Sequence, residues 1–193
     1  MGLHVLLGRA DRHRPTTTLG ASMETWDALR ARRDVREFED REIAPADLER
    51  ILEAARRSPS SSNRQRWDFV VVTDRERLGE LSQVWKGAGH VAGARVALAL
   101  TAPWWDSERD RDSTHYDLGQ ATMSIMVAAA DLGIASRHAS VEDKDLAASL
   151  LGVPDGHFVA WLISLGHPAD RALKPIERPD RRAFEDVVHW ERW

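Results

Sequence analysis

The sequence predicts a mixed fold of helices and strands arranged around one sheet. Three short runs, mostly of apolar and β-branched residues, are typical of buried strands and lie at 67–73, 96–101 and 158–165. Stretches with apolar residues three or four positions apart lie between these runs and indicate helices. Since the chain has no internal repeat and no low-complexity tract, we expect all these elements to share a single core.

The composition excludes several classes of protein. A chain of 193 residues, with 42% hydrophobic and 30% charged residues, is typical of one ordinary globular domain. The net charge of −4 argues against a nucleic-acid-binding protein, which usually has a basic face. No apolar stretch approaches the roughly 20 residues of a membrane-spanning helix. The absence of cysteine excludes disulfides, thiolate zinc sites and iron–sulfur clusters, and it fits a cytoplasmic location.

Residues 1–22 are expected to form a flexible leader ahead of one domain at 23–193. The start of the chain lacks both the basic segment and the cleavage-like Ala-x-Ala of an export signal. Unanchored termini are usually mobile, although an ordered arm that packs on a partner chain is the alternative. Met23 is a possible original start of the protein.

The first half of the domain is expected to begin with two helices. Apolar positions three residues apart predict the first helix over 24–33. Pro45 suits the first position of the second helix, which is expected to end near Ser58 because a proline follows. The strand at 67–73 and a further helix at 75–85 come next.

The second half contains the longest expected helix, at 115–132. It is apolar on most sides, which is typical of a helix in the middle of a fold or at a subunit interface, and Gly133 suits its C-terminal end. The elements expected around it are a buried strand at 96–101, a solvated loop at 106–112, a helix at 142–151 and a strand at 158–165.

The C-terminal end combines a polar loop with an apolar tail. Residues 166–182 are rich in proline and charge, which predicts a surface loop. The tail at 184–193 reads FEDVVHWERW and carries too much apolar surface to leave in water, at ~25 cal/mol for each Å². We therefore expect the tail to bury against another surface.

Most local motifs are better explained by structure than by chemistry. The glycines at 87–93 are spaced GxGxxxG, with a helix before and a strand after, which reverses the order that a dinucleotide fingerprint requires. The histidines form no zinc-binding pair, and no GxSxG nucleophile motif is present, so no metal site and no catalytic side chain is expected. Trp104 and Trp105 are expected as core or interface aromatics rather than as part of an acceptor site.

Three polar segments carry the functional hypothesis. Arg32, Arg33 and Arg36 end the first helix, where they form either an ordinary cationic helix end or a guanidinium cradle for a phosphate. The polar loop at 59–65 joins a core helix to a core strand, where binding groups are held rigidly. The third segment is a basic group that consists of Arg178, Arg181 and Arg182.

Together and in this order, these segments resemble the FMN-dependent nitroreductase family. The family's opening Arg-Arg-Ser-Val-Arg-x-Phe pattern is similar to RRDVREF at 32–38, and its Pro-Ser-Ser-x-Asn-x-Gln-Pro-Trp pattern is similar to PSSSNRQRW at 59–67. The end of the long helix, the LGHP at 165–168 and the VVHW of the tail also match. The resemblance covers about 24–193.

The resemblance implies an α+β, three-layer fold with a central, mostly antiparallel sheet flanked by helices. It also implies an intertwined homodimer, in which the C-terminal arm is exchanged and the loop at 59–65 reaches the flavin of the partner subunit. The implied FMN-binding residues include the three arginines of the first segment for the phosphate and the polar ring edge, and backbone near flavin N5 at Ala139 and Ser140. The whole implied set is Arg32, Arg33, Asp34, Arg36, Pro59, Ser60, Ser61, Ser62, Asn63, Gln65, Ala139, Ser140, Arg178, Arg181 and Arg182.

The implied activity is a transfer of hydride from NADH or NADPH, through flavin N5, to a nitroaromatic, quinone or related small-molecule acceptor by ping-pong kinetics. FMN supplies this chemistry, so the protein contributes binding, orientation and electrostatics. A protein that sequesters FMN without turnover is the main alternative, and a structural dimer without flavin is another.

Two positions depart from the family pattern. Asp34 replaces the usual serine, and its charge would repel a phosphate unless Arg33 or Arg36 neutralises it; it would otherwise accept a hydrogen bond from the ring N3–H. Arg66 replaces the usual proline, which makes the loop before Trp67 less rigid.

Overall fold

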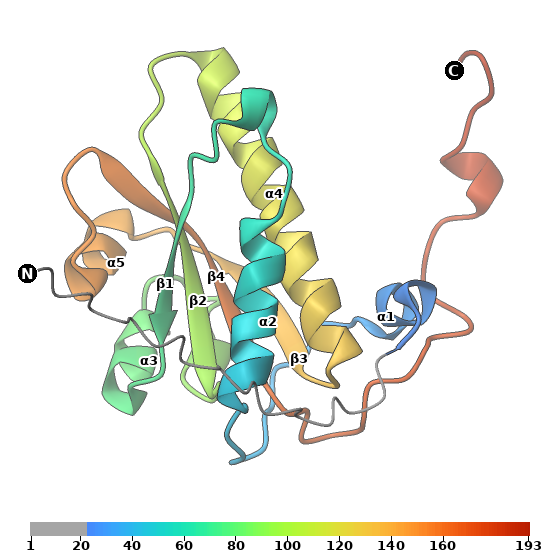
Figure 1. The fold of residues 1–193 in the computed structure, drawn as a ribbon, viewed down its shortest axis with the longest axis horizontal. Coiled ribbons are helices and arrows are strands. Elements are labelled where there is room, and N and C mark those ends of the chain that lie inside the picture. Colours follow the sequence, from blue (N-terminus) through green and yellow to red (C-terminus); the bar gives the residue numbers. More distant parts are fainter. Residues whose placement is uncertain (1–22) are drawn as a thin grey trace, which may run out of the picture.

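The computed structural model describes residues 23–193, and the expected leader at 1–22 lies outside the described residues. Its centre is a four-stranded sheet in the order β1-β2-β4-β3, in which every neighbouring pair is antiparallel (Figure 1). The expected antiparallel sheet is therefore confirmed. The strands are β1 (Asp68–Val72), β2 (Val96–Pro103), β3 (Ala135–Ser140) and β4 (His157–Gly166).

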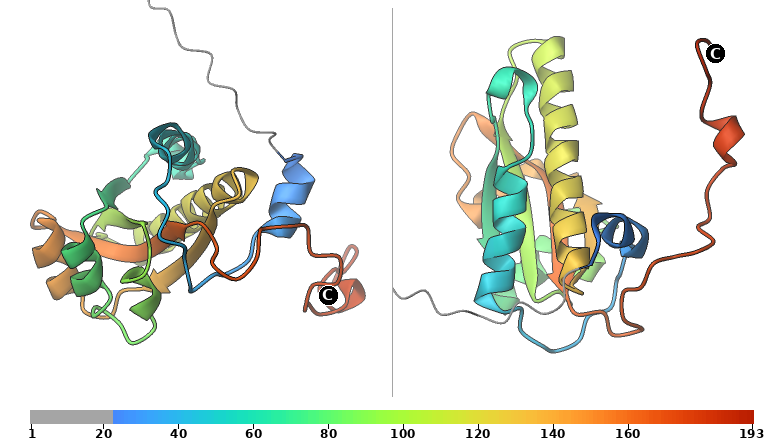
Figure 2. Two further views of the ribbon diagram at one scale, coloured as in Figure 1. Left: turned by 90° about the horizontal axis from the view of Figure 1, so that it is seen from below. Right: turned by 45° about the vertical axis from the view of Figure 1, so that its right-hand side comes forward.

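Helices cover both faces of the sheet and give the expected three layers. On the face of α2 and α4, Ile51 and Ile125 pack in one core with Leu98 of β2. Figure 2 shows α3 and α5 on the other face, where Leu78 packs in a second core with Leu162 of β4. The α-helices are α1 (Thr25–Ala31), α2 (Pro45–Arg56), α3 (Arg75–Leu81), α4 (Glu108–Asp131) and α5 (Lys144–Leu151). No helix within residues 23–193 is both long and apolar enough to span a membrane.

Most predicted elements begin and end within two residues of the observed ones, but the helices α1 and α3 are shorter than expected. The apolar positions that predict α1, Trp26 and Leu29, do not form its buried face. Both are exposed, and the small residues Ala28 and Ala31 are buried instead. Alanine allows the close approach of α1 to α4, and the large apolar side chains of α1 are left on the outside.

The long helix α4 begins seven residues before the expected start at His115, so the prediction of a loop at 106–112 is partly wrong. Ser107 caps the helix by accepting a hydrogen bond from the Asp110 N–H at 3.2 Å, and the acidic first turn suits the positive end of the helix dipole. The predicted C-terminal end is confirmed, since Gly133 has a φ of 70° directly after the helix.

The two edge strands depart most from the sequence prediction. β1 was expected to be buried, yet of its five residues only Val72 is buried, because the strand has a neighbour on one side only. β3 was not predicted as a strand, since Ser136, Arg137 and His138 interrupt its apolar residues. Its place at the edge of the sheet explains how it tolerates these polar side chains.

The segment after β4 runs back along the N-terminal part of the domain and then leaves it. Phe38 forms a bridge with Pro168, and the Ile176 N–H donates to the Arg30 carbonyl at 3.1 Å. As expected, no helix or long strand forms between 167 and 183. The tail extends away from the body of the domain (Figures 1 and 2), with a single 3-10 turn (Phe184–Asp186). Its large apolar side chains are exposed within this chain.

Candidate functional site

The arginine-rich segment lies between the end of α1 and the outer edge of β3. Asp34 pairs with Ser136 in a short parallel bridge, and the Val35 N–H donates to the Ser136 carbonyl at 3.2 Å. Arg32 and Arg36 lie on either side of this bridge in sequence, and Arg36 is exposed. The bridge therefore fixes two of the predicted phosphate ligands beside the strand that carries Ala139 and Ser140.

Arg33 is directed toward the C-terminal segment. Its Nη2 donates to Asp170 Oδ1 at 2.7 Å and to the Arg171 carbonyl at 2.8 Å. The hydrogen bond from Arg33 holds the pKa of Asp170 below its usual value. The guanidinium of Arg33 therefore fastens the chain after β4 to the end of α1, and a contact between Arg33 and a cofactor stays a prediction.

The charge of Asp34 is compensated, but by different arginines from those expected. Arg32 Nη1 lies 3.2 Å from Asp34 Oδ1, and Arg137 Nη1 lies 4.0 Å from Asp34 Oδ2. Neither Arg33 nor Arg36 pairs with Asp34 in the described chain, so that expectation is corrected. Arg137 was missed because it is distant in sequence and lies in a strand that the sequence did not predict.

The outer edge of β3 offers free backbone groups beside these arginines. Because the Ser136 carbonyl accepts from Val35, the backbone polar groups of Ser136, His138 and Ser140 point away from β4, in keeping with the alternation of a strand. Among the described residues, the edge beyond Ser136 has no strand partner. The N–H and C=O groups of this edge are therefore available for hydrogen bonds to the polar rim of a flat ring. The side chain of Ala139, between His138 and Ser140, is buried in the core.

The loop at 59–65 has an unusual and well-anchored backbone. Ser62, Asn63 and Gln65 have φ values of 53°, 55° and 51°, in the left-handed region that favours glycine. Ser60 Oγ accepts a hydrogen bond from the Gln65 N–H at 3.0 Å and closes the loop on itself. Arg64 and Arg66 both pair with Asp110 of α4, so the loop is held in place despite the missing proline at position 66.

One chain brings together only part of the predicted site. The arginine segment lies near the C-terminal end of α4, whereas the loop at 59–65 lies by its N-terminal half, at the opposite end of the domain (Figure 1). The exposed basic residues Arg178, Arg181 and Arg182 lie in the segment that leaves the domain beside α1, where Arg181 and Arg182 donate to the backbone carbonyls of Asp180 and Asp186. Within one chain the loop at 59–65 and the arginine segment therefore do not meet.

A buried histidine lies behind the arginine segment and was not singled out by the sequence. His90 Nδ1 lies 2.8 Å from Ser164 Oγ, while His90 Nε2 and Arg137 Nε are buried without a hydrogen-bond partner among the described residues. Burial, followed by the nearby charges of Arg137 and Arg36, lowers the pKa of His90 to about 4. The neutral imidazole of His90 thus fastens the loop at 87–93 to β4.

The pKa of His90 predicts that acid destabilises the fold. In the unfolded chain His90 titrates near 6.5, so between about pH 6.5 and pH 4 the unfolded state binds a proton that the folded state excludes. The free energy of unfolding should therefore decrease as the pH falls through this interval, by at most about 1.4 kcal/mol per pH unit from this group. Urea unfolding of the wild type and of His90→Gln should give a shallower pH dependence for the variant; equal slopes would contradict the assignment.

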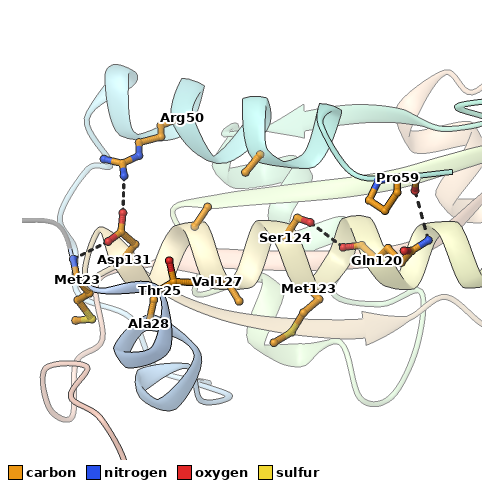
Figure 3. Close-up of a pocket in the computed structure, with 12 residues that line it drawn as sticks. Met23, Thr25, Ala28, Arg50, Pro59, Gln120, Met123, Ser124, Val127 and Asp131 are labelled. Atoms are coloured by element: carbon orange, nitrogen blue, oxygen red, sulfur yellow. Dashed lines mark hydrogen bonds and ion pairs between the residues drawn. The ribbon is translucent and has the colours of Figure 1, made fainter. Parts of the chain in front are cut away.

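A cavity of about 790 Å³ lies between α1, α2 and α4 (Figure 3). Met123 and Val127 of α4 give it an apolar wall, and Asp131 closes one end by accepting from the Met23 N–H and from Arg50, each at 2.6 Å. Of the predicted cofactor residues only Pro59 lines this cavity. It is thus a separate apolar surface of the domain.

The residues beside β3 fit the group that the resemblance implies. FMN combines a phosphate with a flat ring whose edge both donates and accepts hydrogen bonds. Arg32 and Arg36 supply guanidinium groups for a phosphate, and the free edge at His138 and Ser140 supplies backbone donors and acceptors for a ring.

Comparisons with known proteins agree with this geometry. The family model described as Nitroreductase family matches residues 29–88. An Archaeoglobus fulgidus protein named NADH dehydrogenase/NAD(P)H nitroreductase is 35% identical over 166 residues, covering 84% of this chain and 94% of that protein. A Bacillus subtilis protein named FMN reductase is 27% identical, covering 88% of this chain and 74% of that protein. The solved structure of an FMN-dependent nitroreductase from Clostridium difficile R20291 is similar with a TM-score of 0.75 at 26% identity, covering 86% of this chain and 98% of that chain.

Proposed function

Because the chain belongs to the nitroreductase family, we propose that it is an FMN-dependent oxidoreductase that takes electrons from NADH or NADPH. The acceptor is a nitroaromatic, a quinone or a related small molecule, and donor and acceptor use the same open face in turn, which gives ping-pong kinetics. The observation that carries the proposal is the edge of β3 at His138 and Ser140, which has no strand partner within residues 23–193 and lies directly beside the bridge that fixes Arg32 and Arg36.

When bound, FMN supplies a ring that receives a hydride at N5 and releases it to an acceptor. The chain's own residues bind and orient it. Arg32 and Arg36 would hold the phosphate and the polar ring edge through charge-assisted hydrogen bonds, and backbone near Ala139 and Ser140 would lie near N5. Positive charge and N–H donors near the ring stabilise the negative charge that reduction adds.

The working unit in this proposal is a homodimer with two sites between the subunits. The loop at 59–65 of one subunit completes the site that holds the arginines of the other. The exposed tail at 184–193 and the apolar cavity between α1, α2 and α4 are surfaces that a second copy would cover. A single domain at 23–193 and a cytoplasmic location stay part of the proposal.

A sequestering protein would bind FMN through the same residues without turnover, so the test must separate binding from reduction. The purified protein, saturated with FMN under nitrogen, should lose its visible flavin absorbance within seconds of adding NADH or NADPH, and recover it when an acceptor such as a quinone is added. Binding without bleaching by either donor would favour sequestration. Failure to bind FMN at all would refute both functions.

A further inference from the structure

Asp117 is a buried carboxylate in the middle of α4, and its contacts are with the loop at 59–65. The residue is only 5% exposed. Both of its oxygens accept from the backbone N–H of Ser61, with Ser61 N lying 3.1 Å from Oδ1 and 3.0 Å from Oδ2. Gln120 stands one turn later, and its Nε2 lies 3.5 Å from Asp117 Oδ1 and 3.4 Å from the Pro59 carbonyl. Two consecutive turns of α4 thus hold the start of the loop.

The carboxylate of Asp117 is costly to bury at this position. Among the described residues it has no cationic partner within 4 Å, and it lies more than two turns from the N-terminal end of α4, where the helix dipole would favour an anion. Burial of an unpaired charge costs several kcal/mol, and an apolar side chain at this position, next to Leu118, would support the core at a lower cost in stability. A need for core stability therefore does not explain this residue.

The backbone of the loop gives the reason for an anchor. Three residues that are not glycine, at positions 62, 63 and 65, hold left-handed φ values, and such conformations persist only where the surroundings impose them. Asp117 fixes the loop at Ser61, while Asp110, two turns earlier on the same helix, pairs with Arg64 at 2.7 Å. The loop is thus tied to α4 directly before its strained part, at Ser61, and within it, at Arg64.

We propose that Asp117 is a positioning residue for cofactor binding, which holds the loop at 59–65 in the shape that reaches the flavin of the partner subunit. This inference rests on the proposed function, since it takes the loop to be part of an FMN site. The new claim is that Asp117, which does not contact the arginine segment of its own subunit, sets the FMN affinity of the partner's site. The negative charge acts through the Ser61 N–H, which it orients and polarises.

The test compares Asp117→Ala and Asp117→Asn in the full chain with the control Asp112→Asn, an exposed acid on the same helix. Loss of one charge-assisted hydrogen bond should weaken FMN binding of Asp117→Ala by about tenfold to a hundredfold, and Asp117→Asn, which keeps one acceptor oxygen, should recover part of this loss. The melting temperature of the flavin-free Asp117→Ala protein should be close to that of the wild type, because the loss of the hydrogen bond to the exposed Ser61 is offset by the removal of a buried charge. Unchanged FMN affinity, or a melting temperature that falls as well, would overturn the proposal.

A mixed dimer tests whether Asp117 acts on the partner's site. Co-expressed Asp117→Ala and Arg32→Ala subunits, isolated through two different tags, should contain one intact site, since the arginine of the first subunit meets the loop of the second. About one tight FMN site per mixed dimer is expected, against none in either parent dimer. Two weak sites in the mixed dimer would overturn the action across subunits. If the wild type binds no FMN, the proposed function itself fails, and the two failures are thus distinguished.

Discussion

Removal of residues 184–193 is expected to abolish the dimer. Within one chain Phe184, Trp190 and Trp193 are 62%, 78% and 100% exposed, so the fold of the subunit does not use them. Each such aromatic side chain contributes a few kcal/mol to an interface when it is buried, at ~25 cal/mol for each Å². Their loss from both subunits of a dimer would remove a large part of the association free energy.

Light scattering coupled to size-exclusion chromatography should therefore give a monomer, or aggregates, for the truncated chain and a dimer for the full chain. Because the core of α2, α4 and the sheet contains no residue of the tail, the far-ultraviolet circular dichroism of a truncated monomer should be unchanged. Glu185→Gln in the full chain is the matched control, since it changes an exposed residue of the tail without removing apolar surface. A truncated protein that remains a well-folded dimer would contradict the role given to the tail.

The sequence predicts those parts of the fold in which burial dictates the residue pattern. β2 and β4 lie in the middle of the sheet and have continuous apolar runs, while the apolar stripe of α2 faces the core, so each was found within two residues. β3 was missed because its edge position admits Arg137 and His138, and the first turns of α4 were missed because they are charged. Hydrophobic patterns therefore miss those elements, or parts of elements, in which polar residues interrupt the apolar pattern.

The candidate site shows the same limit. Arg32, Arg36 and the loop at 59–65 were found because they form local motifs. Asp117 and Arg137 were not found, because their partners Ser61 and Asp34 are 56 and 103 positions away in the sequence and only the fold brings them into contact. The one signal for Asp117 was an acidic residue directly before the apolar half of the helix, which begins at Leu118.

Arg32→Ala is expected to weaken FMN binding by ~1.5–3 kcal/mol, or about tenfold to a hundredfold in the dissociation constant, because a charge-assisted hydrogen bond to the phosphate is lost. A second effect adds to the first. Arg32 also pairs with Asp34 at 3.2 Å, and its removal leaves that carboxylate with Arg137 alone, at 4.0 Å, so the freed negative charge repels the phosphate. Arg30→Ala is the matched control and should bind FMN as the wild type does, because Arg30 lies two positions earlier and its only ion pair among the described residues is with Asp27.

A double-mutant cycle with Asp34→Ser separates the two effects of Arg32→Ala on FMN binding, which are the lost hydrogen bond to the phosphate and the freed charge of Asp34. If Asp34 repels the phosphate, the serine variant alone should bind FMN more tightly, and Arg32→Ala should cost less in that background than in the wild type. If Asp34 instead accepts a hydrogen bond from the ring, Asp34→Ser should weaken binding, and the two losses should add. Titration of the flavin-free proteins with FMN, followed by the quenching of flavin fluorescence, measures all four dissociation constants. A dissociation constant for Arg32→Ala equal to that of the wild type would show that Arg32 does not bind the phosphate, because the alanine variant has no guanidinium with which to bind it.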